Sequence, residues 1–359
     1  MSTPPKPGSN PRSSAGLSTG LYRVAIVGGS TLKGKEVAEI LNDRNFPAAD
    51  VKLLDDDESL GQLESMGDEV TFIQSVRAEQ FDNVDFTFFA SDQECTRKNW
   101  TRAQHSGGAI VDLSYALEEE PSARVRSPWI ERELGTTVPA DLQPGPVVIA
   151  HPAAIVLALL LLRARKAGRI SRVVATVFEP ASEHGQRGMD ELHQQTVNLL
   201  SFQQLPKAVF DTQVAFNMIA RYGENASSTL ESVERRVLRH LEQIAGPDLP
   251  RPSLLMVQAP IFHGHTLSVF LEMEKTVAVG DLSQALAGEH VSVTRLASES
   301  PSNVNAAGQG DILVSVGRDA NHENGYWLWA ASDNLRIAAS TAVEAAEAMM
   351  SSRPRGKVQ

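Results

Sequence analysis

The chain of 359 residues contains a single cysteine, Cys95. One thiol excludes a disulfide within the chain and a metal site built from several thiolates, and it suits the reducing cytoplasm, where we expect the protein. Long hydrophobic runs are also lacking. The longest, residues 153–162, is shorter than the roughly 20 residues that a bilayer requires. We expect a buried helix there, and the N-terminal segment has no apolar stretch typical of a signal peptide.

Excess positive charge is lacking as well, because the formal net charge is −11. We therefore expect neither nucleic acid nor an anionic membrane as a partner. With 42% hydrophobic and 21% charged residues, the composition is that of a globular protein long enough for two domains. Residues 1–20, mostly Pro, Ser, Thr, Gly and basic residues, are the exception, and we expect them to form a disordered tail.

The first half of the chain predicts a Rossmann-like, doubly wound parallel sheet. Residues 22–27 are an apolar, β-branched run that enters a glycine-rich turn, and helical spacing follows that turn. The other elements that we expect here are strands at residues 51–54, 70–73, 84–89 and 109–111, and a helix at residues 95–105. This order is typical of an α/β domain, which we place at residues 21–151.

After residue 151 the pattern changes to longer, more alternating strands separated by amphipathic helices. The expected strands are residues 172–179, 253–262 and 265–273, and the expected helices are residues 188–202 and 230–244. This pattern predicts an α+β domain with a largely antiparallel sheet over residues 152–333. An alanine-rich helix at residues 334–350 could return to the first domain, to which we assign residues 334–352.

Six motifs, in order and at matching spacing, resemble the aspartate-semialdehyde dehydrogenase family. They are Gly28-x5-Gly34, Arg-Asn-Phe-Pro at 44–47, Gly-Met-Asp-Glu-Leu at 188–192, Ala-Phe-Asn at 215–217, Pro260-x3-Gly264-His265 and Ser-Asp-Asn-Leu-Arg at 332–336. The resemblance spans about residues 22–350 and is greatest to Usg-type homologues. It implies a dinucleotide-binding domain, a dimerisation domain and hence a homodimer. It also implies NADPH-dependent reduction of aspartyl phosphate through a cysteine thioester.

The catalytic thiol that this resemblance implies is missing. Where the family has Asn-Pro-x-Cys-x-Thr, residues 151–156 read His-Pro-Ala-Ala-Ile-Val, with Ala154 at the thiol position. A methyl group cannot form a thioester. Cys95 follows a strand that faces the nicotinamide in the family, but Asp92 and Glu94 would raise its pKa, the opposite of activation. We therefore interpret Cys95 as a buried structural residue, in a loop.

His265 matches the acid/base histidine of the family. If it lies on a strand with His263, alternation puts both side chains on one face. The alternative is a hydrogen-bonded structural imidazole near an interface. Two histidines without a third ligand do not make a metal site, so we expect none.

The residues that would bind an anionic substrate are altered. Gln258 replaces an arginine that would bind a carboxylate through a bidentate pair of hydrogen bonds. Glu179 replaces a glutamine beside the thiol, and Glu118 replaces a phosphate-binding arginine. Arg236 stands where the family has an anion-binding lysine and is the one anchor that could survive, although surface arginines are common on such a helix.

The cofactor residues are altered too. In the loop from Gly28 through Ser30 to Gly34, Thr31 replaces the middle glycine that lets backbone approach the diphosphate. The acidic run at residues 55–58 would repel the 2′-phosphate of NADP. Asp55 could instead hold a ribose hydroxyl of NAD, or the run could be a solvated turn. NADP is thus disfavoured, NAD is compatible with the sequence, and no cofactor is assigned.

The other cofactor-binding candidate is Ser114. It stands in the segment where the family reads Asn-Ser-Ser-x-x-Arg.

These changes lead us to expect a homologue that has lost the thioester reaction and acts as a dimeric binding or regulatory protein. The alternative is an active oxidoreductase with an altered substrate or cofactor. Such an enzyme would use His265, Glu179 or Glu183 as acid or base on an uncharged or cationic ligand. A semialdehyde dehydrogenase that uses Cys95 is a third hypothesis. The sequence does not identify the ligand.

Overall fold

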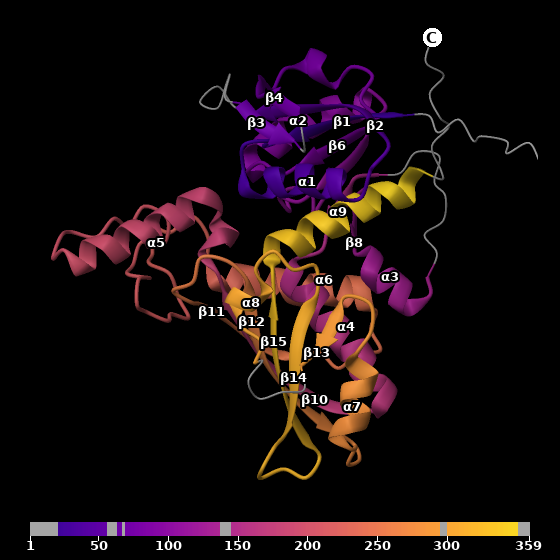
Figure 1. Cartoon of the computed structure of the whole chain (residues 1–359), viewed down its shortest axis with the longest axis vertical. Helices are drawn as coiled ribbons and strands as arrows, with labels where there is room; N and C mark the ends of the chain where they lie inside the picture. The colour runs from indigo at the N-terminus through magenta and orange to yellow at the C-terminus, as the bar shows by residue number, and fades with distance from the viewer. Residues whose placement is uncertain (1–20, 56–62, 67–68, 137–144, 295–299, 351–359) are drawn as a thin grey trace, which may run out of the picture.

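A computed structural model describes residues 21–55, 63–66, 69–136, 145–294 and 300–350 (Figure 1). The N-terminal segment expected to be a tail, and the acidic residues after Asp55, lie outside these ranges. The chain forms an upper part around a parallel sheet and a lower part around a mixed sheet, and helix α9 (Asn334–Met350) lies where the two parts meet (Figure 1).

The upper sheet confirms the Rossmann-like prediction. Its strand order is β5-β2-β1-β6-β7-β9-β8, and every pairing described within it is parallel. The strands are β1 (Tyr22–Val27), β2 (Ala48–Asp55), β5 (Gln74–Ser75), β6 (Phe86–Phe89), β7 (Ala109–Asp112), β8 (Arg124–Arg126) and β9 (Val147–Ile149). Strands β6 and β7 are buried at every residue, as expected for a sheet with both faces covered.

Helices α1 (Leu32–Asp43) and α2 (Gln93–His105) and the 3₁₀ turn η2 (Ala78–Phe81) accompany this sheet. Helix α3 (Pro128–Leu134) packs into the core of the lower part, where its Trp129 and Ile130 are buried. Helix α1 begins directly after the glycine-rich turn, because the Thr31 side chain caps it by accepting a hydrogen bond from the backbone N of Gly34 (3.0 Å). The strand, turn and helix that the sequence predicts are therefore all present.

The strand expected at residues 70–73 does not belong to the parallel sheet, so that prediction is wrong. Strand β4 (Glu69–Phe72) pairs antiparallel with β3 (Leu63–Met66) in a separate two-stranded sheet. The Phe72 side chain is 60% exposed. A four-residue apolar run does not distinguish a buried strand from one arm of a hairpin, and the edge of the parallel sheet is formed by β5 instead.

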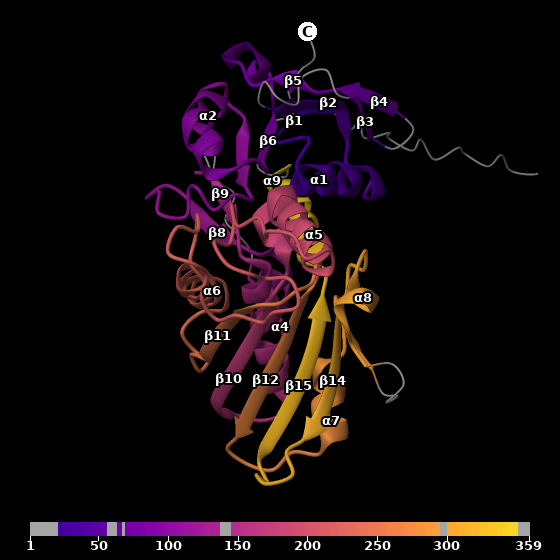
Figure 2. The ribbon, with the colours of Figure 1, turned by 90° about the vertical axis from the view of Figure 1, so that its left-hand side faces the viewer.

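The lower sheet has the order β11-β10-β12-β15-β14-β13. Its strands are β10 (Ile170–Glu179), β11 (Ser253–Gln258), β12 (His265–Met273), β13 (Val291–Val293), β14 (Ile312–Arg318) and β15 (Gly325–Ser332). The four central strands are antiparallel, as predicted, whereas edge strands β11 and β13 run parallel to their neighbours. Figure 2 shows β11, β10, β12, β15 and β14 side by side. Strand β11 ends four residues before the predicted limit, just ahead of Pro260, which has no N–H to donate.

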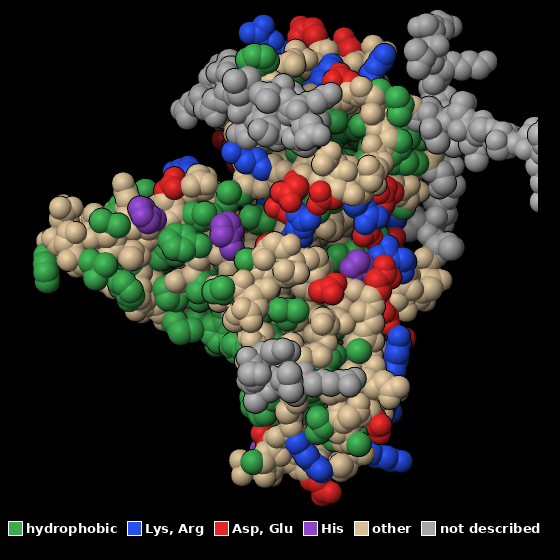
Figure 3. All heavy atoms as spheres, viewed as in Figure 1, with side chains coloured by type: hydrophobic (Ala, Val, Ile, Leu, Met, Phe, Trp, Pro, Cys, Tyr) green, Lys and Arg blue, Asp and Glu red, His purple; other side chains and the backbone are tan. Residues whose placement is uncertain are grey.

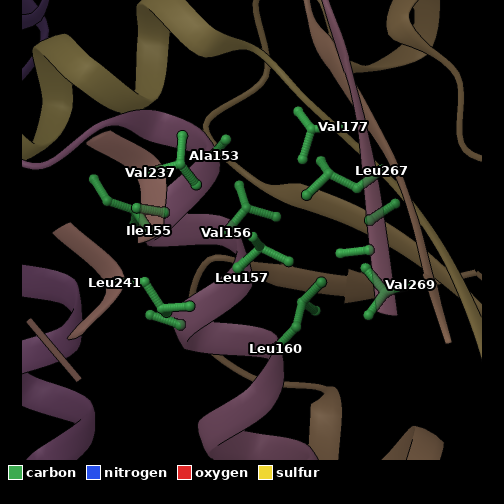
Figure 4. Packing of buried hydrophobic residues seen from close by; sticks show 14 of the residues in the cluster. Ala153, Ile155, Val156, Leu157, Leu160, Val177, Val237, Leu241, Leu267 and Val269 are labelled. Atoms are coloured by element: carbon green, nitrogen blue, oxygen red, sulfur yellow. The ribbon is translucent and has the colours of Figure 1, made fainter. Parts of the chain in front are cut away.

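Helix α4 (Pro152–Ala167) is the central helix of the lower part, and α6 (Leu230–Ala245) and α7 (Val279–Leu286) pack against it. The others described are η3 (Ala181–His184), α5 (Gly185–Leu200) and α8 (Asn303–Ala306), and α5 projects away from α4 (Figure 1). Helix α4 is buried from Pro152 to Ala164, which explains its apolar sequence. In Figure 4, Leu157 and Leu160 of α4 face β12, with α6 on the opposite side. No helix in the described ranges is both long and apolar enough to span a membrane.

Helix α9 returns to the upper part, where it packs on the parallel sheet and α1. Its small residues Ala338, Ala342 and Ala346 are buried in the same core as Val24 of β1. At its start, Arg336 lies within 2.9 Å of three carboxylates of α1, those of Glu36, Glu39 and Asp43. The start of α9 also lies at the start of β12, where Oδ1 of Asn334 accepts the backbone N–H of Gly264 (3.1 Å).

Candidate functional site

The residues of the expected site meet where the upper and lower parts join, around the N-terminus of α4. His151 is the N-cap of this helix, and its Nδ1 accepts a hydrogen bond from the backbone N of Ala153 (3.2 Å). Ala154, in the first turn, is fully buried, and its backbone N donates to the carbonyl of His151 (2.8 Å). Burial lowers the pKa of His151 well below its usual value, so this imidazole is neutral at pH 7.

His265 is the first residue of β12 and lies beside His151, with 5.7 Å between the ring centroids. It is fully buried, and neither ring nitrogen has a hydrogen-bond partner among the described residues. Its Nε2 lies 3.8 Å from Oε1 of Glu183. Burial lowers the pKa of His265 although Glu183 opposes this shift. The arrangement leaves a neutral imidazole next to a carboxylate, with ring nitrogens available for a proton or a hydrogen bond.

His263 does not share a strand face with His265, so that prediction is wrong. Strand β12 begins at His265, and Gly264 before it has a φ of +84° in the left-handed region that favours glycine. The chain thus turns between the two histidines, and strand alternation does not apply to them. Among the described residues, no group of three or more His, Cys, Asp or Glu side chains could hold a metal ion.

Glu183, in η3, is the carboxylate of this site. Its Oε1 accepts a hydrogen bond from Nδ2 of Asn334 (2.8 Å), and Nζ of Lys33 lies 3.8 Å from its Oε2. Burial alone would raise the pKa of Glu183, but the charge of Lys33 in particular, together with the two histidines and Asn334, lowers it to about 2. Glu183 is therefore ionised, and its pair with Lys33 links the start of α1 to the lower part.

Tyr115 covers His151, with ring centroids 5.6 Å apart and an interplanar angle of 25°. Two cations contact its ring, Nζ of Lys33 at 4.8 Å and Cζ of Arg236 at 4.9 Å from the centroid, distances typical of cation–π pairs. The backbone φ of Tyr115 is +64°, which is unusual for a bulky residue and is held by the surrounding structure. This strained residue therefore fixes the positions of three groups of the site.

Glu118 and Arg236, both predicted as substrate residues, contact each other. Arg236 of α6 approaches the Glu118 carboxylate with Nε (2.9 Å) and Nη2 (3.1 Å). Nε2 of His240 lies 3.1 Å from the same carboxylate, while Nδ1 of His240 accepts the backbone N–H of His151 (3.0 Å). Because Nδ1 accepts, the proton of a neutral His240 is on Nε2, which donates to Glu118. Arg236 is thus already paired with a carboxylate of the chain.

Glu179 and Gln258 are cross-strand neighbours at the ends of β10 and β11. The Gln258 amide donates to the carbonyls of Glu179 (3.0 Å) and Ala259 (2.8 Å), and its Oε1 accepts from the Tyr222 hydroxyl (2.8 Å). Gln258 is therefore held by the chain itself. Oε2 of Glu179 is buried without a hydrogen-bond partner among the described residues. His184 lies 3.5 Å from the other carboxylate oxygen.

The glycine-rich turn has many of its hydrogen-bonding groups engaged within the chain. The Thr31 hydroxyl contacts the carbonyls of Gly28 (2.8 Å) and Ala90 (3.0 Å) while it caps Gly34. Oδ2 of Asp55 accepts from both the backbone N (2.8 Å) and the hydroxyl (2.5 Å) of Ser30. The amides of Ser30 and Gly34 are the type of group that would bind a diphosphate. As it stands, the turn does not fit a dinucleotide well.

Ser114 and Cys95 are also bound within the upper part. The Ser114 hydroxyl donates to Oδ1 of Asp112 (2.6 Å), which also accepts the Ser114 backbone N–H (2.7 Å). Cys95 lies in the first turn of α2, which Asp92 caps by accepting the Cys95 backbone N–H (2.8 Å). Cys95 is only partly buried, so the prediction of a buried cysteine in a loop is wrong. Burial, and to a lesser extent Asp92, raises the pKa of the Cys95 thiol.

Four side chains that complete the site were not predicted as site residues. These are Lys33, Tyr115, His151 and His240. Lys33 is the second residue of α1, and the sequence gives no indication that it pairs with a residue 150 positions later. The structure brings His265 and Glu183 together beside His151 at the start of α4, with Ala154 three residues further on. It pairs Glu118 with Arg236 and places the cofactor-loop residues on the upper side of the junction.

Comparisons with known proteins agree with this arrangement. Residues 23–152 match the semialdehyde dehydrogenase NAD binding domain, and residues 161–337 match the semialdehyde dehydrogenase dimerisation domain. An aspartate-semialdehyde dehydrogenase from Rickettsia bellii is 30% identical over 92% of this chain and 98% of its own length. A USG-1 protein homolog from Azotobacter vinelandii is 30% identical over 91% of this chain and 97% of its own length.

The same holds for solved structures. That of a probable aspartate-semialdehyde dehydrogenase from Pseudomonas aeruginosa superposes with a TM-score of 0.82 at 27% identity, and the match covers 92% of this chain and 98% of that one. Together with the two domain matches and the relatives at 30% identity, this shows that the chain belongs to the aspartate-semialdehyde dehydrogenase family.

Proposed function

We propose that this protein has given up the thioester reaction of its family and acts as a dimeric binding or regulatory protein. The observation that carries the proposal is Ala154, a buried methyl group in the first turn of α4, three residues after His151, whose ring lies beside that of His265. No thiol is available to replace it, because the one cysteine of the chain is in α2 with its pKa raised.

Dimerisation is supported by hydrophobic side chains on the surface of the lower part. On and just after α5, Leu200 is 70% exposed and Phe202 is 98% exposed, and Figure 3 shows hydrophobic side chains gathered over this helix. Trp327 and Trp329 of β15 are also partly exposed, on the sheet face opposite α4. Exposed apolar surface of this kind is typical of a protein interface. Size-exclusion chromatography with light scattering tests the proposal, which a monomer would contradict.

The direct test of the lost reaction is turnover. We expect the purified protein to show no oxidation of aspartate semialdehyde with phosphate and either NAD or NADP above a control without protein. We also expect Ala154→Cys alone to restore little or no activity, because Arg236 is paired with Glu118 and Gln258 is bound within the chain. Turnover by the unaltered protein would refute the proposal, and robust turnover by the variant would show that the anion-binding changes matter little.

A second candidate function is acid/base chemistry on an uncharged or cationic ligand. It is favoured by His265, whose two buried ring nitrogens lack hydrogen-bond partners among the described residues, 3.8 Å from an ionised Glu183. Thermal shifts with amines, amino acids, NAD and NADP test this candidate. Absence of any shift would remove it.

Cofactor affinity supplies a further prediction, at Thr31. We expect Thr31→Gly to tighten NAD binding by about fivefold or more, because it frees the Gly34 amide and removes a branched side chain from the turn. Isothermal titration measures the effect. Thr31→Ser is the control, since it keeps the hydroxyl that bridges Gly28 and Ala90. Equal NAD affinity in the unaltered protein and in Thr31→Gly would contradict this explanation.

A further inference from the structure

The Glu118 carboxylate has the set of partners that proteins give to a bound anion. Its Oε1 lies 3.1 Å from Nη2 of Arg236 and 2.8 Å from Nη2 of Arg239, and its Oε2 lies 2.9 Å from Nε of Arg236 and 3.1 Å from Nε2 of His240. Four donors thus contact two oxygens, and one arginine binds through both Nε and Nη2. This is the geometry by which arginine recognises carboxylates and phosphates.

The donors and the acceptor come from different elements. Arg236, Arg239 and His240 occupy positions i, i+3 and i+4 of α6, so they lie on one face of that helix. Glu118 comes from the turn between β7 and β8, more than a hundred positions earlier in the chain. Helix α6 therefore presents a cationic face that would exist without Glu118, and the upper part of the molecule supplies the anion.

This face has more binding capacity than one carboxylate uses. The Arg239 Nε is buried and has no hydrogen-bond partner among the described residues. Nη1 of Arg239 lies 3.4 Å from Oε1 of Glu119, whose side chain is 83% exposed, so solvent weakens this ion pair. Glu118 therefore leaves one donor of this face without a partner in the described part of the chain.

The anion position adjoins the candidate site. Cζ of Arg236 lies 4.9 Å from the centre of the Tyr115 ring, and that ring stacks on His151. His240 contacts Glu118 with one ring nitrogen and the backbone of His151 with the other. A ligand bound beside His151 and His265 with an anionic group on this side would have to displace Glu118.

We propose that Glu118 is a resident anion that occupies an oxyanion-binding face of α6, formed by Arg236, Arg239 and His240, and that it makes the site reject ligands with a carboxylate or phosphate at this position. The ligand is then a neutral or cationic small molecule. The ligand class rests on the proposed binding function. The exclusion of anions by Glu118 does not, and it can be tested separately.

Inorganic phosphate binding tests the proposal in the full-length protein. We expect Glu118→Ala to bind phosphate at least about tenfold more tightly than the unaltered protein by isothermal titration, since the arginines lose their internal partner. Glu119→Ala is the matched control, because it removes a neighbouring exposed carboxylate from Arg239 and should behave like the unaltered protein. A double variant, Glu118→Ala with Arg236→Ala, should lose the gain.

A second readout, the melting temperature, also shows whether the variants are folded. Phosphate should raise the melting temperature of Glu118→Ala more than that of the unaltered protein, at ionic strength matched with chloride. If the alanine variant does not fold, Glu118→Gln keeps the size of the side chain and should show the same excess shift. A folded variant with no gain in phosphate affinity or melting temperature overturns the inference. Neither readout requires turnover. A negative result would therefore contradict this inference without bearing on the loss of the thioester reaction, which the turnover assay tests.

Discussion

Glu118→Gln is expected to lower the free energy of unfolding by about 2 kcal/mol at pH 7, because it leaves Arg236, Arg239 and His240 without their shared carboxylate. Partial solvent contact screens these pairs and keeps the loss below that of a fully buried cluster. Urea denaturation measures it. Glu119→Gln should change stability little, since the Glu119 side chain is 83% exposed.

The loss of unfolding free energy in Glu118→Gln should become smaller as the pH falls. Burial alone would raise the pKa of Glu118, but hydrogen bonds from His240 and Arg236 and the charge of Arg236 outweigh it, and lower the pKa from 4.5 to about 2. A carboxylate whose pKa is lower in the folded state stabilises the fold above its unfolded pKa, and this contribution disappears as the pH falls through the folded value. The difference between the unaltered protein and Glu118→Gln should therefore be full above about pH 5 and shrink towards pH 2. A difference that stays constant over this range would show that the charge is not its cause.

The sequence predicted best where local patterns are strong. Strand β1, the glycine-rich turn, and the limits of β12 and α9 match the structure because apolar runs and helical spacing are local properties. The sequence failed at β4, whose short apolar run is equally compatible with a hairpin. The expectation that His263 and His265 share a strand face was also wrong, because an alternation rule does not register the turn at Gly264.

The candidate site was predicted as a list of altered positions and not as an arrangement. The sequence could show that Ala154 lacks a thiol and that Glu118 replaces an arginine. It could not show that Glu118 then pairs with Arg236, because the contact joins residues 118 positions apart and depends on how the two parts of the molecule are joined. The roles of Lys33 and His240 depend on similar distant contacts. The role of each altered side chain is thus clear only when its hydrogen-bond or ion-pair partner in the folded chain is known.

Gly34→Ala is expected to destabilise the fold by about 3 kcal/mol. Gly34 matches a glycine of the cofactor-binding motif, but the reason for the loss is packing. A Cβ at this position would lie 2.0 Å from the carbonyl oxygen of Gly28 and 2.9 Å from its carbonyl carbon. Both are backbone atoms, so the clash cannot be relieved by a side-chain rotation and the turn itself must move. The close approach of α1 to β1 therefore requires this glycine whether or not a dinucleotide binds.

The matched control for this prediction is Gly280→Ala in α7, where an added Cβ meets no atom within 4 Å. Alanine should stabilise that helix by about 0.5 to 1 kcal/mol, because glycine loses more backbone entropy on folding. Urea denaturation of both variants, without cofactor, gives the comparison. If Gly34→Ala were as stable as the unaltered protein, packing would not explain why this glycine persists, and a ligand contact at the turn would be the better explanation. A large loss in the absence of any dinucleotide would instead show that a retained glycine fingerprint is not evidence for NAD or NADP binding in this chain.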